Sequence, residues 1–222
     1  MQLSDVACEQ DDRVLFSGVH CAVENGSLIQ FGGPNGVGKT TLLRALTTIA
    51  PDYLGNIQWQ GEALAHSLND FRNHLLYIGH LPAVKRELTP KENLKFAAAL
   101  QGQVFSDEAI YQALNQLSIA PYMDFSCDQL SAGQLRRVAL ARLFLPAPPL
   151  WILDEPFTAL DVHGVELLTN RFAQHAEQGG AVIFTTHQDV PLPNLTLINL
   201  ADYRGGANRE VSDSVVKEVD DE

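Results

Sequence analysis

A glycine-rich run near residue 35 has the residue types and the spacing that bind phosphate groups. Residues 33–40 read Gly-Pro-Asn-Gly-Val-Gly-Lys-Thr and match the phosphate-binding loop pattern G-x-x-x-x-G-K-[ST] at every fixed position. Glycine lets successive backbone amides point toward one anion, Lys39 can reach the β- and γ-phosphates, and Thr40 can ligate Mg²⁺. The chain is therefore expected to bind ATP with Mg²⁺ through Gly33, Pro34, Asn35, Gly36, Val37, Gly38, Lys39, Thr40 and Thr41.

Two adjacent carboxylates, Asp154 and Glu155, follow the apolar run 150–153. Asp154 suits a contact with Mg²⁺, and Glu155 can orient and polarise an attacking water. Taken alone, a strand that ends in Asp-Glu is more often a surface turn. Downstream of a phosphate-binding loop, the same pair favours hydrolysis of the bound triphosphate, with Glu155 as a catalytic residue.

The pentapeptide Leu-Ser-Ala-Gly-Gln at residues 130–134 lies between these two motifs. Ser131 and Gln134 form a capping box, and small residues at a helix start leave backbone amides free for an anion. Here the chain resembles the ABC ATPases, whose signature reads Leu-Ser-Gly-Gly-Gln. The resemblance implies two head-to-tail copies that bury two ATP molecules between them, with contacts to the other copy's ATP from Ser131, Ala132, Gly133 and Gln134.

Further residues correspond to functional positions of that family. The resemblance implies that Asp161 contacts the opposite copy and that His187 holds the γ-phosphate as a catalytic residue. His80 occupies the place of a glutamine that touches Mg²⁺ and senses the membrane partner. Because imidazole is a poor ligand for the hard Mg²⁺ ion, His80 is expected to act in coupling through a bound water. The aromatic residue that often stacks on adenine is missing, so Arg13 is considered as a substitute, while Phe16 is assigned to the core.

Alternating strand and helix signals must position these motifs. Strands are predicted at the apolar runs 27–31, 57–60, 75–78, 150–153 and 181–185, and a helix at 39–49. Capping residues Thr89, Ser106 and Ser131 predict helices that run to about 101, 117 and 145. The expected fold is α/β, a P-loop NTPase of the ABC ATPase type with a mostly parallel sheet core, an antiparallel β part and a helical subdomain at about 84–130.

Length and charge limit the possible organisation and partners. The 222 residues suit one compact domain, expected over 1–204, followed by an acidic and disordered tail at 205–222. The formal net charge of −12 disfavours nucleic acid as a partner. The sequence contains no apolar run of roughly 18 residues and no signal-peptide pattern, so the chain is expected to stay in the cytoplasm. The cysteines at 8, 21 and 127 share no ligand-like spacing and are expected to be reduced.

Several longer strings resemble one branch of the family, the ATP-binding subunits of the haem exporter for cytochrome c maturation. They are Tyr-Ile-Gly-His-Leu-Pro-Ala-Val-Lys at 77–85, Leu-Ser-Ala-Gly-Gln at 130–134, the run 151–157 and Gln-His-Ala-Glu-Gln-Gly-Gly at 174–180. The resemblance implies a second copy of the chain, integral-membrane subunits and, indirectly, a haem chaperone as partners at the cytoplasmic face of a bacterial inner membrane. ATP hydrolysis would drive haem delivery or release of the haem-loaded chaperone, and no haem site is expected on this chain.

Three alternative functions stay open at this point. A transporter ATPase for another cargo fits the same motifs, since cargo choice lies in the membrane partner. A soluble ABC ATPase that acts on the ribosome or DNA is disfavoured, because the chain has one phosphate-binding loop, no heptads and an acidic composition. A regulator that binds ATP without hydrolysing it is disfavoured by the presence of both Glu155 and His187.

Overall fold

A computed structural model describes residues 1–10, 13–50 and 52–204, and the tail predicted for 205–222 lies outside this part. Its larger sheet has five parallel strands in the order β6-β7-β8-β3-β9. They are β3 (Leu28–Gly32), β6 (Leu75–Ile78), β7 (Leu150–Leu153), β8 (Ala181–Thr185) and β9 (Leu195–Asn199). The runs at 75–78, 150–153 and 181–185 coincide with predicted strands, so the parallel core follows from apolar patterning.

A smaller antiparallel sheet has the order β2-β1-β4-β5. Its strands are β1 (Gln2–Gln10), β2 (Arg13–Ala22), β4 (Leu54–Trp59) and β5 (Glu62–Ala63). Pattern reasoning located only β4, because the pairing of β1 with β2 shifts register at several bulges and its apolar residues do not alternate cleanly. The sequence did indicate an antiparallel part, but through the family resemblance.

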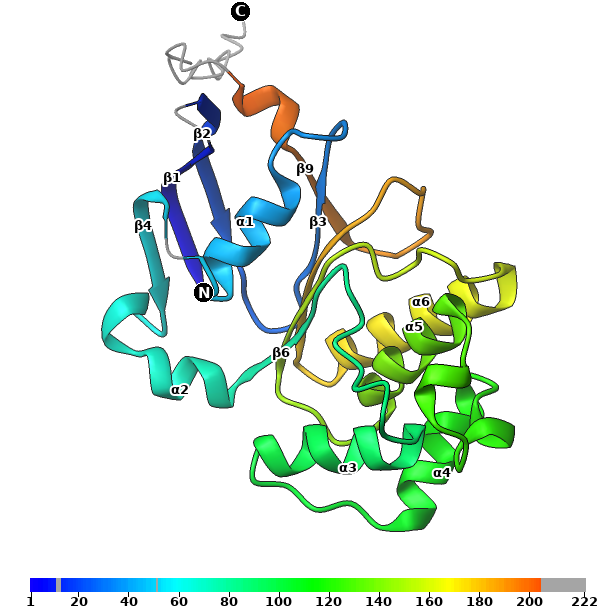
Figure 1. The fold of residues 1–222 in the computed structure, drawn as a ribbon. Helices are drawn as coiled ribbons and strands as arrows, with labels where there is room; N and C mark the ends of the chain where they lie inside the picture. The colour runs from blue at the N-terminus through cyan, green and yellow to red at the C-terminus, as the bar shows by residue number, and fades with distance from the viewer. Residues whose placement is uncertain (11–12, 51, 205–222) are drawn as a thin grey trace, which may run out of the picture.

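The two faces of the parallel sheet bury two separate apolar clusters. Along β7, Leu150 and Ile152 belong to a cluster with α1 (Lys39–Leu46) and the antiparallel sheet, and Phe16 lies in this core as predicted. Trp151 and Leu153 point to the opposite cluster, which α6 (Val162–Glu177) helps to cover. This alternation is the period of two expected for a strand that is buried on both faces. The helix α1 therefore lies between the two sheets (Figure 1).

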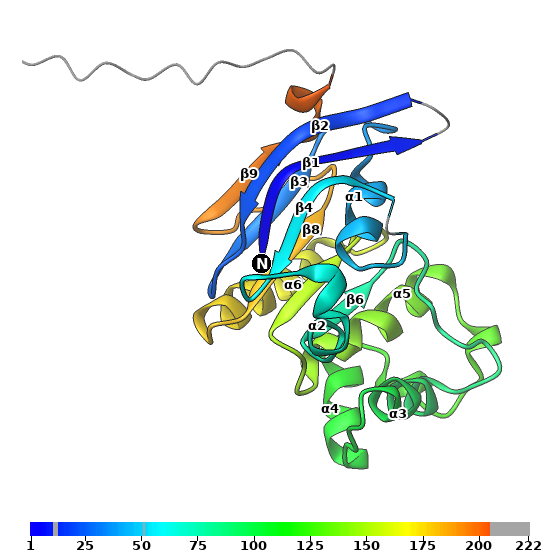
Figure 2. The ribbon, with the colours of Figure 1, turned by 90° about the vertical axis from the view of Figure 1, so that its left-hand side faces the viewer.

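The helical part forms the end of the molecule away from β1 and β2, as Figures 1 and 2 both show. It contains α3 (Pro90–Leu100), α4 (Asp107–Gln116), α5 (Ala132–Leu140) and 3₁₀ turns at Ala120–Tyr122, Cys127–Gln129 and Ala141–Phe144. A short helix α2 (Leu68–Asn73) and 3₁₀ turns at Leu64–His66 and Leu200–Tyr203 complete the elements of the described residues. The helices begin where their capping residues predicted, and α5 with its following 3₁₀ turn extends the helical part beyond the predicted range of 84–130.

Both predicted capping boxes are present. Thr89 Oγ1 accepts from the amide of Glu92 at 3.2 Å, and Glu92 Oε2 accepts from the amide of Thr89 at 2.9 Å. Ser131 and Gln134 make the same reciprocal pair at 3.3 and 2.8 Å. Each box satisfies two amides that would otherwise lack partners at the helix start.

The helix predicted at 39–49 ends earlier, at Leu46. Thr48 has a φ of 60°, which a β-branched residue adopts only when other contacts hold it there. The regular bonding pattern stops here, because the amide of Thr48 donates to the carbonyl of Ala45 at 3.1 Å and that of Ile49 to the carbonyl of Arg44 at 3.0 Å. The prediction missed this end because it treated Pro51 as the only stop signal.

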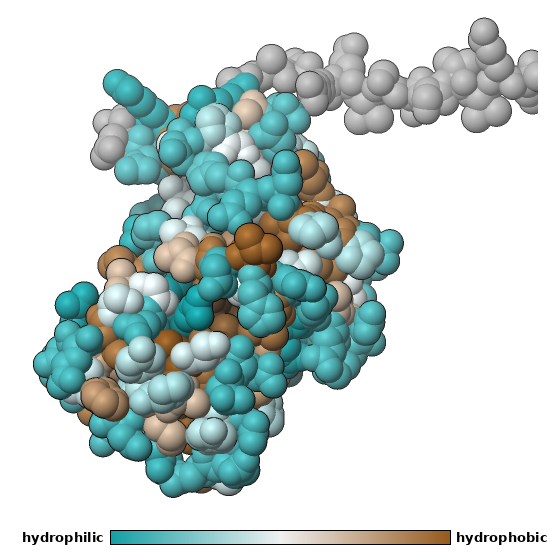
Figure 3. All heavy atoms as spheres, turned by 90° about the vertical axis from the view of Figure 1, so that its right-hand side faces the viewer, coloured by the Kyte–Doolittle hydropathy of each residue, from teal (hydrophilic) through white to brown (hydrophobic). Residues whose placement is uncertain are grey.

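Polar residues cover most of the face that Figure 3 shows, and the apolar residues there lie in separate groups. Among the described residues, no helix combines the length and the apolar character needed to cross a bilayer.

Candidate active site

The phosphate-binding loop joins β3 to α1, as the sequence predicted. Gly33, Gly36 and Gly38 have φ values of 126°, 74° and 106°, which glycine adopts without strain. A Cβ at Gly38 would also lie 2.8 Å from Cε1 of Phe16, so the loop packs directly on the core. Gly38 caps α1 without a side-chain hydrogen bond, which leaves the first-turn amides of α1, including that of Thr41, available to an anion.

Lys39 is held inside the loop. Only 7% of its surface is exposed, and its Nζ donates to the carbonyls of Gly33 at 2.8 Å and Pro34 at 3.4 Å. Burial lowers the pKa of Lys39 from its ordinary value, and the nearby Glu155 and Asp154 oppose that shift. The ammonium is thus positioned where an incoming phosphate can replace weak carbonyl partners.

Asp154, directly after β7, connects the start of α1 and the end of β8 through its carboxylate. It is fully buried, and it accepts from Thr40 Oγ1 at 2.9 Å and from Thr185 Oγ1 at 2.7 Å. Thr40 and Asp154 offer a hydroxyl and a carboxylate oxygen side by side, a donor set that fits the hard Mg²⁺ ion. Sequence reasoning missed Thr185, although its place at the end of β8 was a usable signal, since the carboxyl ends of neighbouring parallel strands converge.

Glu155 has a strained backbone and an unsatisfied oxygen. Its φ is 48°, and its amide donates to Thr185 Oγ1 at 3.0 Å. Its Oε1 lies 3.3 Å from His187 Nε2, but that nitrogen also lies 3.2 Å from Lys39 Nζ, which can only donate. Which of these two groups Nε2 bonds to depends on the tautomer of the ring. Among the described residues no hydrogen bond to the buried Oε1 is found, and His187 Nε2 is its nearby polar atom.

One open cavity of about 280 Å³ brings six of the predicted site residues together with Thr158, which was not predicted. Its lining consists of Asn35, Lys39, Thr40, His80, Glu155, Thr158 and His187. These residues follow β3, β6, β7 and β8, so the cavity lies at the carboxyl ends of the parallel strands, where such sheets bind ligands. The position of His80 in this lining agrees with its predicted place beside the site.

The signature residues lie outside this cavity, next to another predicted residue. Ser131 and Ala132 are exposed at the start of α5, and a Cβ on Gly133 would approach the carbonyl of Ala159 at 3.7 Å. Asp161 caps α6 through the amide of Gly164 at 2.8 Å and pairs with Arg137 of α5 at 2.9 Å. The signature residues and Asp161 thus form one exposed surface beside the cavity, without reaching its nucleotide-binding residues.

Arg136 was not predicted as part of the site. It is 5% exposed on α5, and its guanidinium donates to the carbonyls of Asp154 at 2.7 Å and Glu155 at 2.9 Å. A signal was present, because Arg136 lies four residues before the buried Leu140 and therefore on the apolar face of α5. Arg13 is exposed at the start of β2, and nothing in the described residues places it against the cavity.

Comparisons with known proteins agree with this geometry. The model of the ABC transporter family matches residues 16–158. The chain is 48% identical to a cytochrome c biogenesis ATP-binding export protein, CcmA, of Vibrio parahaemolyticus, over 91% of this chain and 100% of that protein. It is also 48% identical to the corresponding protein of Salmonella typhi, over 93% of this chain and 98% of that one.

Solved structures show the same fold. An ABC transporter ATP-binding protein from Pyrococcus furiosus superposes with a TM-score of 0.79 at 25% identity, over 91% of this chain and 98% of that chain. A dimeric ATP-binding cassette bound to ADP and phosphate superposes with a TM-score of 0.71 at 22% identity, over 84% of this chain and 88% of that chain. The chain therefore belongs to the ABC transporter family, as an ATP-hydrolysing subunit related to the cytochrome c biogenesis ATP-binding export proteins.

Proposed function

We propose that this chain hydrolyses ATP, as one of a pair of identical copies, to drive an exporter that serves cytochrome c biogenesis. The observation that carries the proposal is the buried Oε1 of Glu155, which lacks a partner among the described residues and borders the phosphate-binding cavity. A carboxylate oxygen in that position can accept a proton from a water that attacks the γ-phosphate. Because no hydrogen bond to Glu155 Oε1 is found among the described residues, this oxygen can accept the proton of the attacking water.

Each residue of the cavity has a role in this proposal. The loop residues Gly33 to Thr41 cradle the phosphates of ATP, and Lys39 exchanges its carbonyl partners for phosphate oxygens. Thr40 and Asp154 would hold Mg²⁺, which would neutralise charge on the β- and γ-phosphates when bound. His187, 3.2 Å from Lys39 Nζ and 3.3 Å from Glu155 Oε1, holds the γ-phosphate near the base.

The second copy completes the site in this proposal. Ser131, Ala132, Gly133 and Gln134 are outside the cavity of their own chain, and the start of α5 offers amides and a hydroxyl to an anion. Asp161 lies beside them through its pair with Arg137. A head-to-tail pair would bring this surface against the ATP of the other copy, and the fold is shared with a dimeric cassette.

The membrane partner contacts the segment that follows His80 in this proposal. Along that segment, α3 and the loop after α3, four large apolar side chains are exposed: Leu81, Phe96, Leu100 and Val104 at 78%, 41%, 73% and 95%. Exposed apolar groups of this kind mark interaction sites. His80 lies between this segment and the ATP cavity, so it can relay the state of one to the other.

The transported cargo in this proposal is haem, or a haem-loaded chaperone released by hydrolysis, at the cytoplasmic face of the inner membrane. The names of the related export proteins support a place in cytochrome c biogenesis. Nucleic acid is not a proposed partner, because the formal net charge of −12 opposes binding to a phosphate backbone.

Co-purification tests the exporter assignment. The full chain, expressed with its genomic neighbours, would be purified from detergent-solubilised membranes, and its companions identified by mass spectrometry. We expect small multi-span membrane proteins and a haem chaperone. A preparation of the Glu155→Gln chain serves as a control, since arrested turnover should hold the complex together. Recovery of ribosomal or DNA-bound proteins in place of membrane subunits would contradict the assignment and leave the ATPase chemistry intact.

A further inference from the structure

Arg136 connects α5 to two loops of the ATP site in its own chain. Its Nη1 donates to the carbonyls of Gly79 at 2.7 Å and His80 at 3.5 Å. Its Nη2 donates to the carbonyls of Asp154 at 2.7 Å and Glu155 at 2.9 Å. One planar guanidinium therefore binds the backbone after β6 and the backbone after β7 at the same time, and it holds these two loops next to each other.

Burying the guanidinium of Arg136 lowers the free energy of unfolding, so a purely structural role explains this arrangement poorly. Arg136 is 5% exposed, and its Nε lacks a hydrogen-bond partner among the described residues. Burial lowers the pKa of Arg136 from its ordinary value, while Asp154, Glu155 and Tyr77 oppose that shift. Its hydrogen bonds go to neutral carbonyls and not to a carboxylate, so no ion pair in direct contact offsets the desolvation.

The peptide units around Glu155 are held from two sides. Thr185 Oγ1 accepts from the amide of Glu155 at 3.0 Å, and Arg136 donates to its carbonyl at 2.9 Å. Between these two contacts the residue keeps a φ of 48°, which strains a side chain other than glycine. The two contacts together determine where the carboxylate points.

The same helix also begins at the signature. Ser131 caps α5, and Arg136 lies five positions later on that helix of nine residues. Ser131 and Arg136 belong to one hydrogen-bonded helix, so a displacement of its start is expected to displace the guanidinium as well.

We propose that Arg136 is a positioning residue that links the start of α5 to Glu155 and to the His80 loop of the same chain. The proposal rests on the paired arrangement above, in which the start of α5 contacts the ATP of the other copy. ATP bound in one site then sets the geometry of the base in the other site, and hydrolysis in the two sites becomes cooperative.

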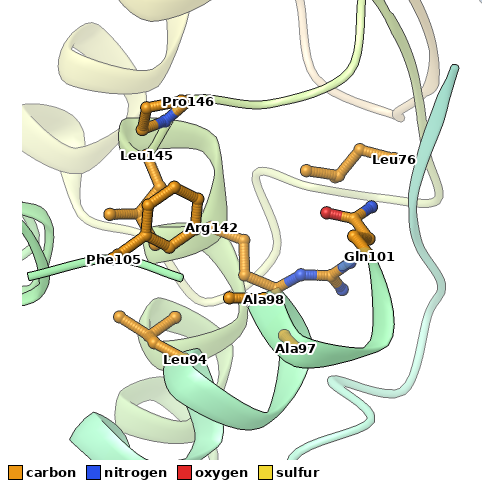
Figure 4. A pocket seen from close by; sticks show the side chains of 9 residues that line it. All are labelled: Leu76, Leu94, Ala97, Ala98, Gln101, Phe105, Arg142, Leu145 and Pro146. Atoms are coloured by element: carbon orange, nitrogen blue, oxygen red, sulfur yellow. The ribbon is translucent and has the colours of Figure 1, made fainter. Parts of the chain in front are cut away.

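Arg142 offers a matched control. It is a partly buried arginine, two residues past the end of α5, and its Nη1 donates to the carbonyl of Tyr77 at 3.3 Å. Burial lowers its pKa as well. It borders a small cavity of about 10 Å³ beside α3. Figure 4 shows it among the side chains that line this cavity. Among its described contacts there is no hydrogen bond to Asp154 or Glu155.

The test compares Arg136→Met, Arg136→Lys and Arg142→Met in the full chain, purified with its membrane subunits. We expect Arg136→Met to lower kcat about tenfold to a hundredfold, since small misplacements of a catalytic group have effects of that size. KM for ATP should stay within about twofold, because the phosphate contacts remain. The Hill coefficient for ATP should fall toward one. Arg136→Lys should recover part of kcat, and Arg142→Met should lower the melting temperature while kcat stays within about twofold.

Two results would overturn the proposal. One is a folded Arg136→Met chain that keeps both kcat and the Hill coefficient of the unchanged protein. The other is an equal loss of kcat in Arg142→Met, which would reveal a general effect of destabilisation. If Arg136→Met does not fold, kcat and the Hill coefficient of Arg136→Lys are compared with those of the unchanged protein instead. This variant keeps the charge and loses the planar fork that spans both loops.

Measuring ATP-dependent dimerisation distinguishes a failure of the proposed role of Arg136 from a failure of the paired arrangement. The chain with both Glu155→Gln and Arg136→Lys should still dimerise with ATP, because the ATP contacts are unchanged. If Glu155→Gln alone stays monomeric with ATP, the paired arrangement fails and the linkage fails with it. If Glu155→Gln dimerises while Arg136→Lys retains full kcat and cooperativity, only the role of Arg136 is contradicted.

Discussion

At the scale of single residues, the ATP site is a set of side chains that hold one another in place before nucleotide arrives. Lys39 donates to the carbonyls of its own loop, and His187 lies between Lys39 and Glu155. The places of Lys39 and Asp154 in this set were predictable, because phosphate binding and Mg²⁺ ligation require particular residue types at fixed spacing. The contributions of Thr185 and Arg136 were not predicted, because they depend on which strand ends become neighbours in the sheet.

His175 provides a residue-scale test away from the ATP site. Its ring stacks on Trp151 at 3.6 Å with an interplanar angle of 10°, and its Nε2 donates to the carbonyl of Pro149 at 2.9 Å. Burial lowers the pKa of His175 from its ordinary value of 6.5, more than the hydrogen bond to Pro149 raises it. The unfolded chain therefore binds this proton more readily, and the free energy of unfolding should fall as pH drops below about 6.5.

Urea unfolding between pH 5 and pH 8 measures that effect. His175→Gln should remove the part of the pH dependence that this ring contributes, because glutamine keeps a donor for Pro149 without titrating. His66→Gln, at an exposed histidine of the 3₁₀ turn Leu64–His66, is the control and should leave the dependence unchanged. If the free energy of unfolding depends on pH in the same way for His175→Gln and for the unchanged chain, the lowered pKa of His175 is contradicted.

At the scale of elements, helix starts were the most predictable features and strands with bulges the least. Thr89, Ser106 and Ser131 each begin a helix where the pattern placed one, since capping is a local property of the sequence. The strands β1 and β2 were missed because long-range pairing and bulges decide their register. The edge strand β9 is half exposed and lacks the continuous apolar run that identified the central strands.

The two capping boxes give a matched pair of element-scale variants. Thr89→Ala and Ser131→Ala each remove a side-chain acceptor for a helix amide, so each should lower the free energy of unfolding by about 1 kcal/mol. Only Ser131 is proposed to contact ATP on the other copy. Ser131→Ala should therefore weaken ATP-dependent dimerisation and Thr89→Ala should not, as measured by urea unfolding and size-exclusion chromatography. A similar loss of dimer in both variants would show that helix stability alone explains the effect.

At the scale of the whole molecule, the chain has two distinct surfaces. One contains the signature pentapeptide at 130–134, and the other contains exposed apolar side chains beside His80. The first has Ser131 and Asp161 at the edge of the ATP cavity, and the second extends from Leu81 to α3. In the proposed arrangement, the first surface contacts a second copy and the second contacts a membrane partner. Binding of ATP between copies can then be linked to movement of the partner through the His80 loop, which Arg136 ties to Glu155.

The most direct test of the account is the molar mass of the Glu155→Gln chain, measured by light scattering with and without ATP and Mg²⁺. We predict a monomer without ATP and a dimer with it. The variant keeps the contacts to the phosphates but loses the base whose hydrolysis of ATP would end the ATP-bound dimer. Adding Lys39→Ala to the same chain should abolish the dimer, since its ammonium no longer reaches the phosphates. A Glu155→Gln chain that binds ATP and stays monomeric at every concentration tested would contradict the paired mechanism.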